Sequence, residues 1–155
     1  MRAVNGIGHQ FGSDELRQRA LTHASTGANR DNERLEFLGD TVLDLIAAEE
    51  LFRRYPGHSE GQLTTAKAWL VSRETLAEAA RRIGLADLAE FGRGMTAEAA
   101  PRSVLANLFE AVLGAIYLDA GLEAARAWAL EVLASALASA SRAGEARNHK
   151  QRLQE

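Results

Sequence analysis

The chain has 155 residues, which is enough for one domain with a buried core, and its net charge at pH 7 is only −3. It contains no cysteine, so disulfide scaffolds and thiolate metal sites are excluded. We expect no signal peptide and no segment that could cross a bilayer, which predicts a soluble cytoplasmic protein without a membrane partner.

Helices are predicted over almost the whole chain. Alanine and leucine dominate, runs of β-branched residues are missing, and the only prolines are Pro56 and Pro101. The first helix is expected to begin at Ser13 or Asp14, because both residue types cap helix N-termini.

The next predicted helix begins near residue 31 or 32 and ends before the Tyr-Pro-Gly turn at 55–57. Glu33, Glu36 and Asp40 are three and seven positions apart, so a helix stacks their carboxylates on one face. Acids at this spacing usually form a solvated face. The same spacing also suits a hard divalent cation, which binds carboxylate oxygens.

Other residues of this helix favour the cation interpretation. The face opposite the acids is a predicted core stripe of Leu35, Leu38, Val42, Leu45 and Ile46. Phe37 projects beside the acids instead of into that stripe. Gly39 costs the helix roughly 1 kcal/mol relative to alanine. Neither residue is expected on an ordinary solvated face.

Local capping patterns predict the following elements. Ser59 with Gln62 forms a capping-box pattern for one helix. Ser72 is expected to cap another helix, which ends at Gly84. The segment 92–101 is the longest predicted loop.

A second chemically unusual helix is predicted from Pro101 to Gly121. Asn107 and Glu110 lie three positions apart on one face, and Gly114 follows one turn later, where it would let another helix approach closely. Packing against the first acidic helix would bring four oxygen-bearing side chains together, namely Glu36, Asp40, Asn107 and Glu110. Oxygen ligands favour Mg²⁺ or Mn²⁺ over zinc.

The remaining elements are simpler. One alanine-rich helix is expected over Leu122–Ala143, and the sequence turns polar beyond Gly144. Trp69 and Trp128 lie on apolar stripes and are predicted to be in the core. His23 is expected to be a hydrogen-bonded structural residue.

The run Glu-Arg-Leu-Glu-Phe-Leu-Gly-Asp at residues 33–40 closely resembles the signature of the ribonuclease III family. The resemblance extends along most of the chain and in family order. Its further landmarks are Ala20–Ser25, Tyr55–Pro56 with Glu60–Gly61, Leu105–Ala111 and Gly114–Asp119.

By this resemblance Glu36, Asp40 and Glu110 occupy the positions of catalytic Mg²⁺ ligands, for which Mn²⁺ is expected to substitute. Asn107 stands where many members have aspartate. Its amide oxygen can coordinate a cation but supplies no charge, so weaker metal binding is expected.

Two further acidic positions of the family match Glu33 and Glu60. For Glu33, metal or water organisation and a structural salt bridge remain alternatives. Glu60 is also explained by favourable placement at a helix N-terminus. Phe37 is expected in a dimer interface, inserted into a pocket of the other subunit.

The resemblance implies the all-α ribonuclease III endonuclease-domain fold, assembled as a homodimer. It implies hydrolysis of double-stranded RNA, such as rRNA and mRNA precursors, with one strand cut by each subunit. The products would carry 5′-phosphate and 3′-hydroxyl ends with a short 3′ overhang. No organic cofactor is expected.

Two alternatives remain. The chain could be a non-catalytic RNA-binding or structural member of the same fold, for which Asn107 is the one argument. It could also be an unrelated all-α phosphohydrolase acting on nucleotides, but such proteins usually use histidine ligands, and the motifs here have none.

The predicted domain boundary lies at residue 146. Residues 1–146 form the expected catalytic domain. Residues 147–155 are similar to a linker and the first residues of the double-stranded-RNA-binding domain found in bacterial members. A frayed helix end is the alternative for this polar segment.

Overall fold

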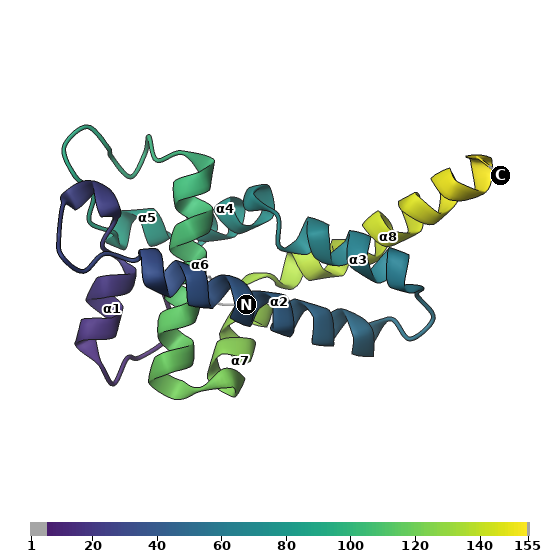
Figure 1. Ribbon diagram of the computed structural model, residues 1–155, viewed down its shortest axis with the longest axis horizontal. Helices are drawn as coiled ribbons and strands as arrows, with labels where there is room; N and C mark the ends of the chain where they lie inside the picture. The colour runs from purple at the N-terminus through teal and green to yellow at the C-terminus, as the bar shows by residue number, and fades with distance from the viewer. Residues whose placement is uncertain (1–5, 155) are drawn as a thin grey trace.

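The fold is built from helices (Figure 1). The structure is a computed structural model that describes residues 6–154, except for the side chains of Arg147, Asn148 and Gln151. Within these residues the only β-type pairing is a single bridge between Thr22 and Glu90, so the all-α prediction is confirmed. The elements are α1 (Asp14–Ala20), η1 (Ala24–Thr26), α2 (Glu33–Arg54), α3 (Glu60–Leu70), α4 (Arg73–Arg82), α5 (Leu85–Leu88), α6 (Arg102–Ala120), α7 (Leu122–Val132) and α8 (Ala134–Gln154).

The predicted helix starts are confirmed where a side chain caps the helix. The hydroxyls of Ser13, Ser59 and Ser72 each accept a hydrogen bond from a backbone N–H in the first turn of α1, α3 and α4. Gln62 completes the predicted capping box with Ser59. Gly84 adopts a left-handed φ of +75° just after α4, as its predicted stop role requires.

Helix α6 is the centre of the core. It packs against α1, α2, α4, α5 and α7, while α3 packs mainly against α8. Phe109 is fully buried, with its ring 5.0 Å from that of Trp128. The Trp128 indole N–H donates to the carbonyl of Ile7, which ties the N-terminal segment to α7. The predicted burial of Trp128 is therefore confirmed.

The central position of α6 also corrects one expectation. By length and composition alone, α6 is apolar enough to cross a bilayer, so the prediction that no segment qualifies was wrong. More than half of the helix is buried against protein. Its apolar residues are accounted for by the core that surrounds them.

The single helix predicted over Leu122–Ala143 was wrong, because the structure divides it into α7 and α8. The break falls at buried Leu133, where the sequence carries neither glycine nor proline. The Arg82 guanidinium, from α4, donates to the Val132 carbonyl and to the Ser135 hydroxyl. This contact satisfies a carbonyl that a continuous helix would have used, so a distant arginine stabilises the break.

Two predicted core residues are exposed. Leu45 of α2 is 51% exposed and Trp69 of α3 is 37% exposed. Trp69 lies on the margin of the buried face of α3, where helical spacing does not distinguish inside from outside. Leu45 lies on the exposed face of α2, away from the buried residues of that helix.

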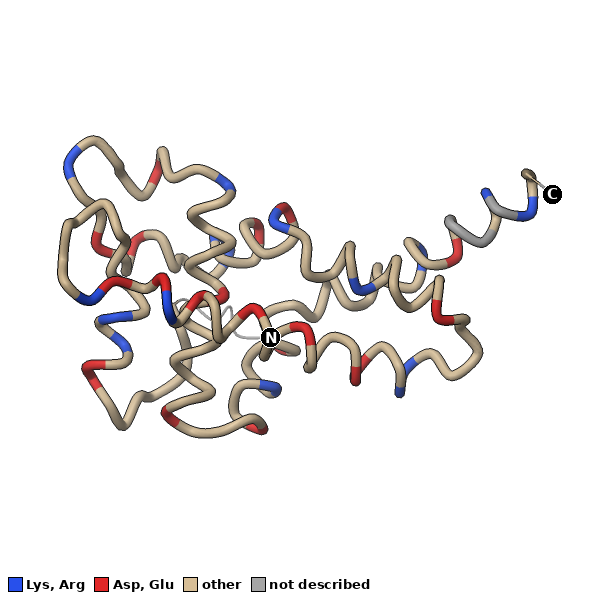
Figure 2. Tube along the Cα trace, viewed as in Figure 1, with Lys and Arg blue, Asp and Glu red and all other residues tan. Residues whose placement is uncertain are grey.

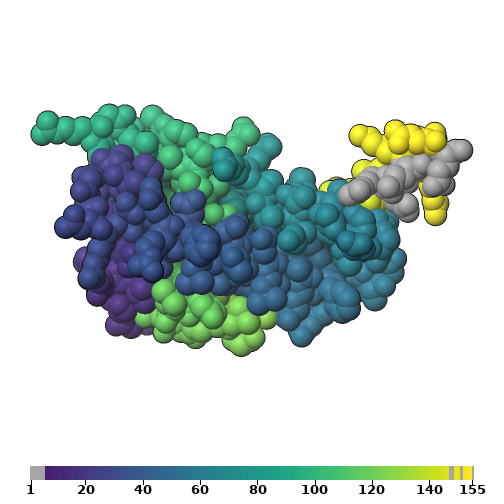
Figure 3. All heavy atoms as spheres, in the orientation of Figure 1, coloured from purple at the N-terminus to yellow at the C-terminus, as the bar shows by residue number. Residues whose placement is uncertain are grey.

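Helix α8 continues as a helix through Gln154 and therefore across the predicted domain boundary. Its C-terminal end projects beyond the body of the molecule (Figures 1 and 3). The assignment of residues 147–155 to a second domain stays a prediction, and Glu155 lies outside the described residues.

Candidate active site

Two glycines allow α2 and α6 to cross with their backbones in contact. A Cβ atom on Gly39 would lie 1.7 Å from the carbonyl oxygen of Glu110. One on Gly114 would lie 2.4 Å from the carbonyl oxygen of Leu35. Only glycine fits at either position, which explains why both helices accept its cost in their interiors. The crossing sets the acidic face of α2 beside the polar face of α6.

An open hollow of about 600 Å³ lies at this crossing. We call it the acidic hollow. It is lined by Glu33, Glu36, Phe37, Asp40, Val71, Arg73, Ala106, Asn107 and Glu110. The structure thus brings together Glu36, Asp40, Asn107 and Glu110, as the predicted packing of the two helices requires. Acidic positions recur along α2 (Figure 2).

Glu110 is the most perturbed carboxyl in the hollow. Burial, followed by the negative charges of Asp40 and Glu36 and a hydrogen bond with Asp40, raises its pKa from 4.5 to about 8. Asp44 raises it further. At neutral pH the hollow therefore favours a protonated Glu110 unless a positive charge is supplied.

Glu36 shows the same effect more weakly. Burial and the neighbouring charge of Glu33 raise its pKa, and Arg73 opposes that shift. With its amide oriented to satisfy its neighbours, Asn107 donates to the Ser103 carbonyl at 3.1 Å and to the Glu36 carboxylate at 3.3 Å. Asn107 therefore holds Glu36 in place in this structure. Its oxygen would have to turn inward to contact a cation.

Glu33 and Glu60 lie in different places. Glu33 is on the rim of the hollow, and its carboxylate forms no ion pair with any described side chain. The structure therefore shows no cationic partner for the structural salt bridge that was one alternative for Glu33. Glu60 is the first residue of α3 and is exposed. It does not line the hollow, and its position agrees with the helix-dipole explanation.

Sequence reasoning missed Val71 and Arg73, which also line the hollow. The Ser72 cap predicts that Arg73 is the first residue of a helix. Nothing local shows that this helix start faces α2, because that arrangement depends on how α4 packs against α6. Arg73 is the one basic side chain among the nine lining residues.

The donor set of the hollow suits a hard cation. Its carboxylate and amide oxygens are ligands that Mg²⁺ prefers. Burial and, after it, the charges of Asp40 and Glu36 raise the pKa of Glu110, and a bound cation would offset both effects. Among residues 6–154, however, no three acidic or histidine side chains are grouped closely enough to enclose an ion. Ligation would require side-chain rotation within the hollow.

A second hollow adjoins the acidic one and is mostly apolar. We call it the apolar pocket, and it measures about 530 Å³. It is lined by Arg19, Glu33, Arg34, Leu35, Phe37, Leu38 and Leu118. Phe37 is 80% exposed between the two hollows, so the prediction that it projects beside the acids is confirmed.

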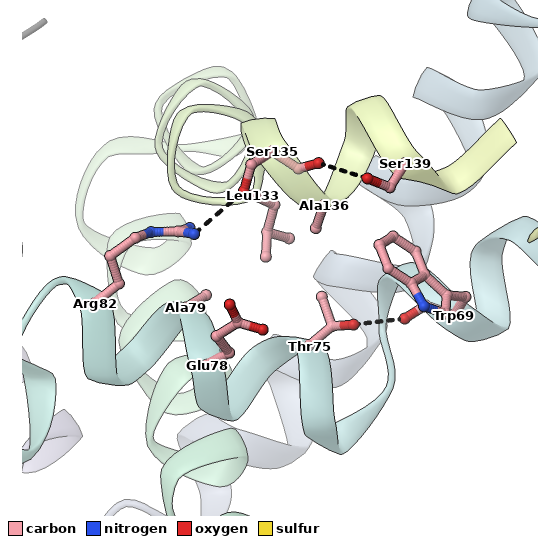
Figure 4. A pocket seen from close by; sticks show the side chains of 9 residues that line it. All are labelled: Trp69, Thr75, Glu78, Ala79, Arg82, Leu133, Ser135, Ala136 and Ser139. Carbon is pink, nitrogen blue, oxygen red and sulfur yellow. Dashed lines mark hydrogen bonds between the residues drawn. The ribbon is translucent and has the colours of Figure 1, made fainter. Parts of the chain in front are cut away.

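A third hollow, between α3, α4 and the junction of α7 with α8, offers little chemistry (Figure 4). Arg82 there is engaged with Val132 and Ser135, and the Thr75 hydroxyl donates to the Trp69 carbonyl. These polar groups satisfy one another, so the site stabilises a junction between helices.

His9 and His23 have structural roles. His23 is partly buried, and its Nδ1 accepts a hydrogen bond from the Ser25 N–H, as expected for a structural residue. His9 contacts Asp119 at 2.9 Å. Asp119 also accepts hydrogen bonds from two backbone N–H groups near the start of α1, and these contacts lower its pKa. This pair fastens the N-terminal segment to α6.

Comparison with known proteins agrees with this architecture. The family described as Ribonuclease-III-like matches residues 13–137. Ribonuclease 3 of Pseudomonas fluorescens SBW25 is 46% identical to this chain, over 99% of the chain and 68% of that protein. Ribonuclease 3 of Azotobacter vinelandii is also 46% identical, with the same coverage.

Solved structures give the same result. The nuclease domain of ribonuclease III from Campylobacter jejuni superposes with a TM-score of 0.78 at 36% identity, covering 82% of this chain and 90% of that one. Dicer from Pichia stipitis superposes with a TM-score of 0.66 at 26% identity, covering 84% of this chain and 59% of that one.

Proposed function

Because this chain belongs to the ribonuclease III family, we propose that the acidic hollow hydrolyses double-stranded RNA with the help of Mg²⁺. The products would carry 5′-phosphate and 3′-hydroxyl ends with a short 3′ overhang. Precursors of rRNA and mRNA in the cytoplasm are the expected substrates.

The observation that carries this proposal is the electrostatic state of Glu110. A half-buried carboxyl with a pKa of about 8, beside Asp40 and Glu36, is a site that favours a bound cation. A purely structural core would have replaced such a group with an apolar residue at little cost. A non-catalytic member of the family would have no need of this arrangement.

Glu36, Asp40 and Glu110 would hold the cation, with Asn107 beside them. A bound Mg²⁺ supplies a water of lowered pKa and neutralises charge on the phosphate. In that state Glu110 is deprotonated, and Asn107 orients Glu36 through the hydrogen bond described above. Glu33, on the rim, would hydrogen-bond water entering the hollow.

The proposed homodimer is supported by the outer face of α2. Arg34, Phe37, Thr41, Leu45, Ala48 and Phe52 follow one another at helical spacing, and all are exposed. Helix α2 runs across the front of the molecule in Figure 3. The apolar pocket lies beside Phe37, so a two-fold axis can place Phe37 of each copy in the pocket of the other. The Campylobacter jejuni nuclease domain has a region involved in dimer formation.

Recognition of A-form RNA would rely on shape and on contacts to phosphates and 2′-hydroxyls. In a dimer, the two acidic hollows would face one duplex, each against one strand. The segment 147–155 would connect to further RNA contacts if, as proposed, it begins a second domain.

One cleavage assay tests the proposed function. Long double-stranded RNA, single-stranded RNA and double-stranded DNA of one sequence are incubated with the protein in Mg²⁺ or in EDTA. We expect fragments from double-stranded RNA in Mg²⁺ alone. Binding of double-stranded RNA without cleavage would favour the non-catalytic alternative. Cleavage in EDTA would show that the reaction does not depend on Mg²⁺.

A further inference from the structure

The charge of the acidic hollow poses a problem for its proposed substrate. Four lining side chains, Glu33, Glu36, Asp40 and Glu110, are acidic. A phosphodiester that enters this hollow brings further negative charge. The basic group nearest to that phosphate is therefore important for the reaction, and Arg73 is the one basic residue that lines the hollow.

Arg73 is free to bind an anion. It is exposed, and it makes no hydrogen bond or ion pair with another residue of the described chain, although Glu36 is close enough for their charges to interact. By contrast, Arg126 forms an ion pair with Glu49 at 2.6 Å, which occupies part of its donor set. An unpaired guanidinium beside several carboxylates keeps its donors available for a ligand.

The position of Arg73 in its helix has an energetic cost. It is the first residue of α4, where a positive charge is repelled by the positive end of the helix dipole. Arg81 and Arg82, in the last turn, are at the favourable end. Helix stability therefore does not explain the arginine at position 73.

Given the proposed function, on which this step rests, we infer that Arg73 is a catalytic residue that binds the phosphodiester being cleaved. Its planar guanidinium donates two hydrogen bonds to the non-bridging oxygens, a geometry that lysine does not reproduce. Water attacks phosphorus, and the bond from phosphorus to the 3′ oxygen breaks. One proton of the water passes to the 3′ oxygen, and the remaining hydroxyl stays on the 5′-phosphate. Arg73 remains protonated and stabilises the charge that builds on the phosphate oxygens.

The test compares Arg73→Gln, Arg73→Lys and, as a matched control, Arg81→Gln on the same helix. Melting temperature, affinity for double-stranded RNA in Ca²⁺, and the single-turnover rate in saturating enzyme and Mg²⁺ are measured for each. We expect Arg73→Gln to melt like the wild type, to bind RNA within about threefold, and to cleave roughly 10–100-fold more slowly. Arg73→Lys should recover part of the rate, and Arg81→Gln should match the wild type.

Three results would overturn the inference. They are a rate for Arg73→Gln within twofold of the wild type, an equal loss in Arg81→Gln, or a loss of affinity that accounts for the whole loss of rate. The last result would place Arg73 on a phosphate remote from the reaction. A wild type that does not cleave would remove the proposed function as well, so the two failures are distinguishable.

Discussion

Glu110 is a single residue that takes part both in the packing of α2 against α6 and in the proposed chemistry. Its backbone carbonyl lies where α2 and α6 touch, and its carboxyl lines the acidic hollow beside the acids of α2. The resulting pKa of about 8 means that the cation-free protein keeps a proton there at neutral pH. Stability and cation binding are consequently linked through one group.

This linkage gives a pH prediction. An unfolded glutamate titrates near 4.5, so between about pH 4.5 and 8 the folded chain holds a proton that the unfolded chain has released. The stability contribution of Glu110 is fully present below pH 4.5 and is lost as the pH rises toward 8. In EDTA, the melting temperature of the wild type should fall more between pH 5 and 8 than that of Glu110→Gln. Parallel melting curves for the two proteins would contradict the raised pKa.

Asn107 gives a second prediction at this scale. Asn107→Asp adds a negative charge beside Glu36 and removes a hydrogen bond to it. We expect the Mg²⁺ concentration for half-maximal cleavage to fall by roughly tenfold, about 1.4 kcal/mol of cation binding. The cation-free variant should also melt below the wild type, because like charges are brought together. An unchanged or higher Mg²⁺ requirement would show that position 107 does not contact the ion.

Among the helices, the sequence predicts the features that depend on residues within one helical turn of each other. The caps at Ser13, Ser59 and Ser72 are local, and all three were predicted. The break at Leu133 depends on Arg82, which is distant in sequence, and no local pattern shows it. Arg73 was missed for the same reason, because its approach to the hollow depends on the packing of α4.

The crossing of α2 and α6 is tested by Gly39→Ala. Alanine should stabilise a helix interior by roughly 1 kcal/mol, but here its methyl group would meet the Glu110 carbonyl. We therefore expect destabilisation by about 3 kcal/mol or more, seen in urea unfolding. Gly57→Ala is the control, because nothing lies within 4 Å of its added methyl group. A Gly39→Ala protein as stable as the wild type would show that the helices do not touch there.

At the scale of the whole molecule, the exposed apolar residues point to a second copy. Leu45 was predicted to be in the core, yet it lies on the outer face of α2 with Phe37 and Phe52. A sequence does not distinguish burial within one chain from burial between chains. The core position predicted for Leu45 was therefore wrong, and its place in a dimer interface is a proposal.

Sedimentation tests the assembly. We expect the wild type to be a dimer at micromolar concentration and Phe37→Ala to shift toward monomer, because a large apolar side chain leaves the interface. Leu153→Ala is the control, since Leu153 is 73% exposed at the far end of α8. A monomeric wild type that still makes paired cuts in a duplex would contradict the dimer.

Single-turnover cleavage of an end-labelled duplex shows whether the acidic hollow cleaves double-stranded RNA. Wild type and Glu110→Gln are compared in Mg²⁺, with RNA affinity in Ca²⁺ and melting temperature measured on the same samples. We expect paired cuts by the wild type and a reaction at least roughly 100-fold slower for Glu110→Gln, with folding and RNA binding retained. Near-normal cleavage by a folded Glu110→Gln protein would contradict this expectation, because the reaction would then occur elsewhere.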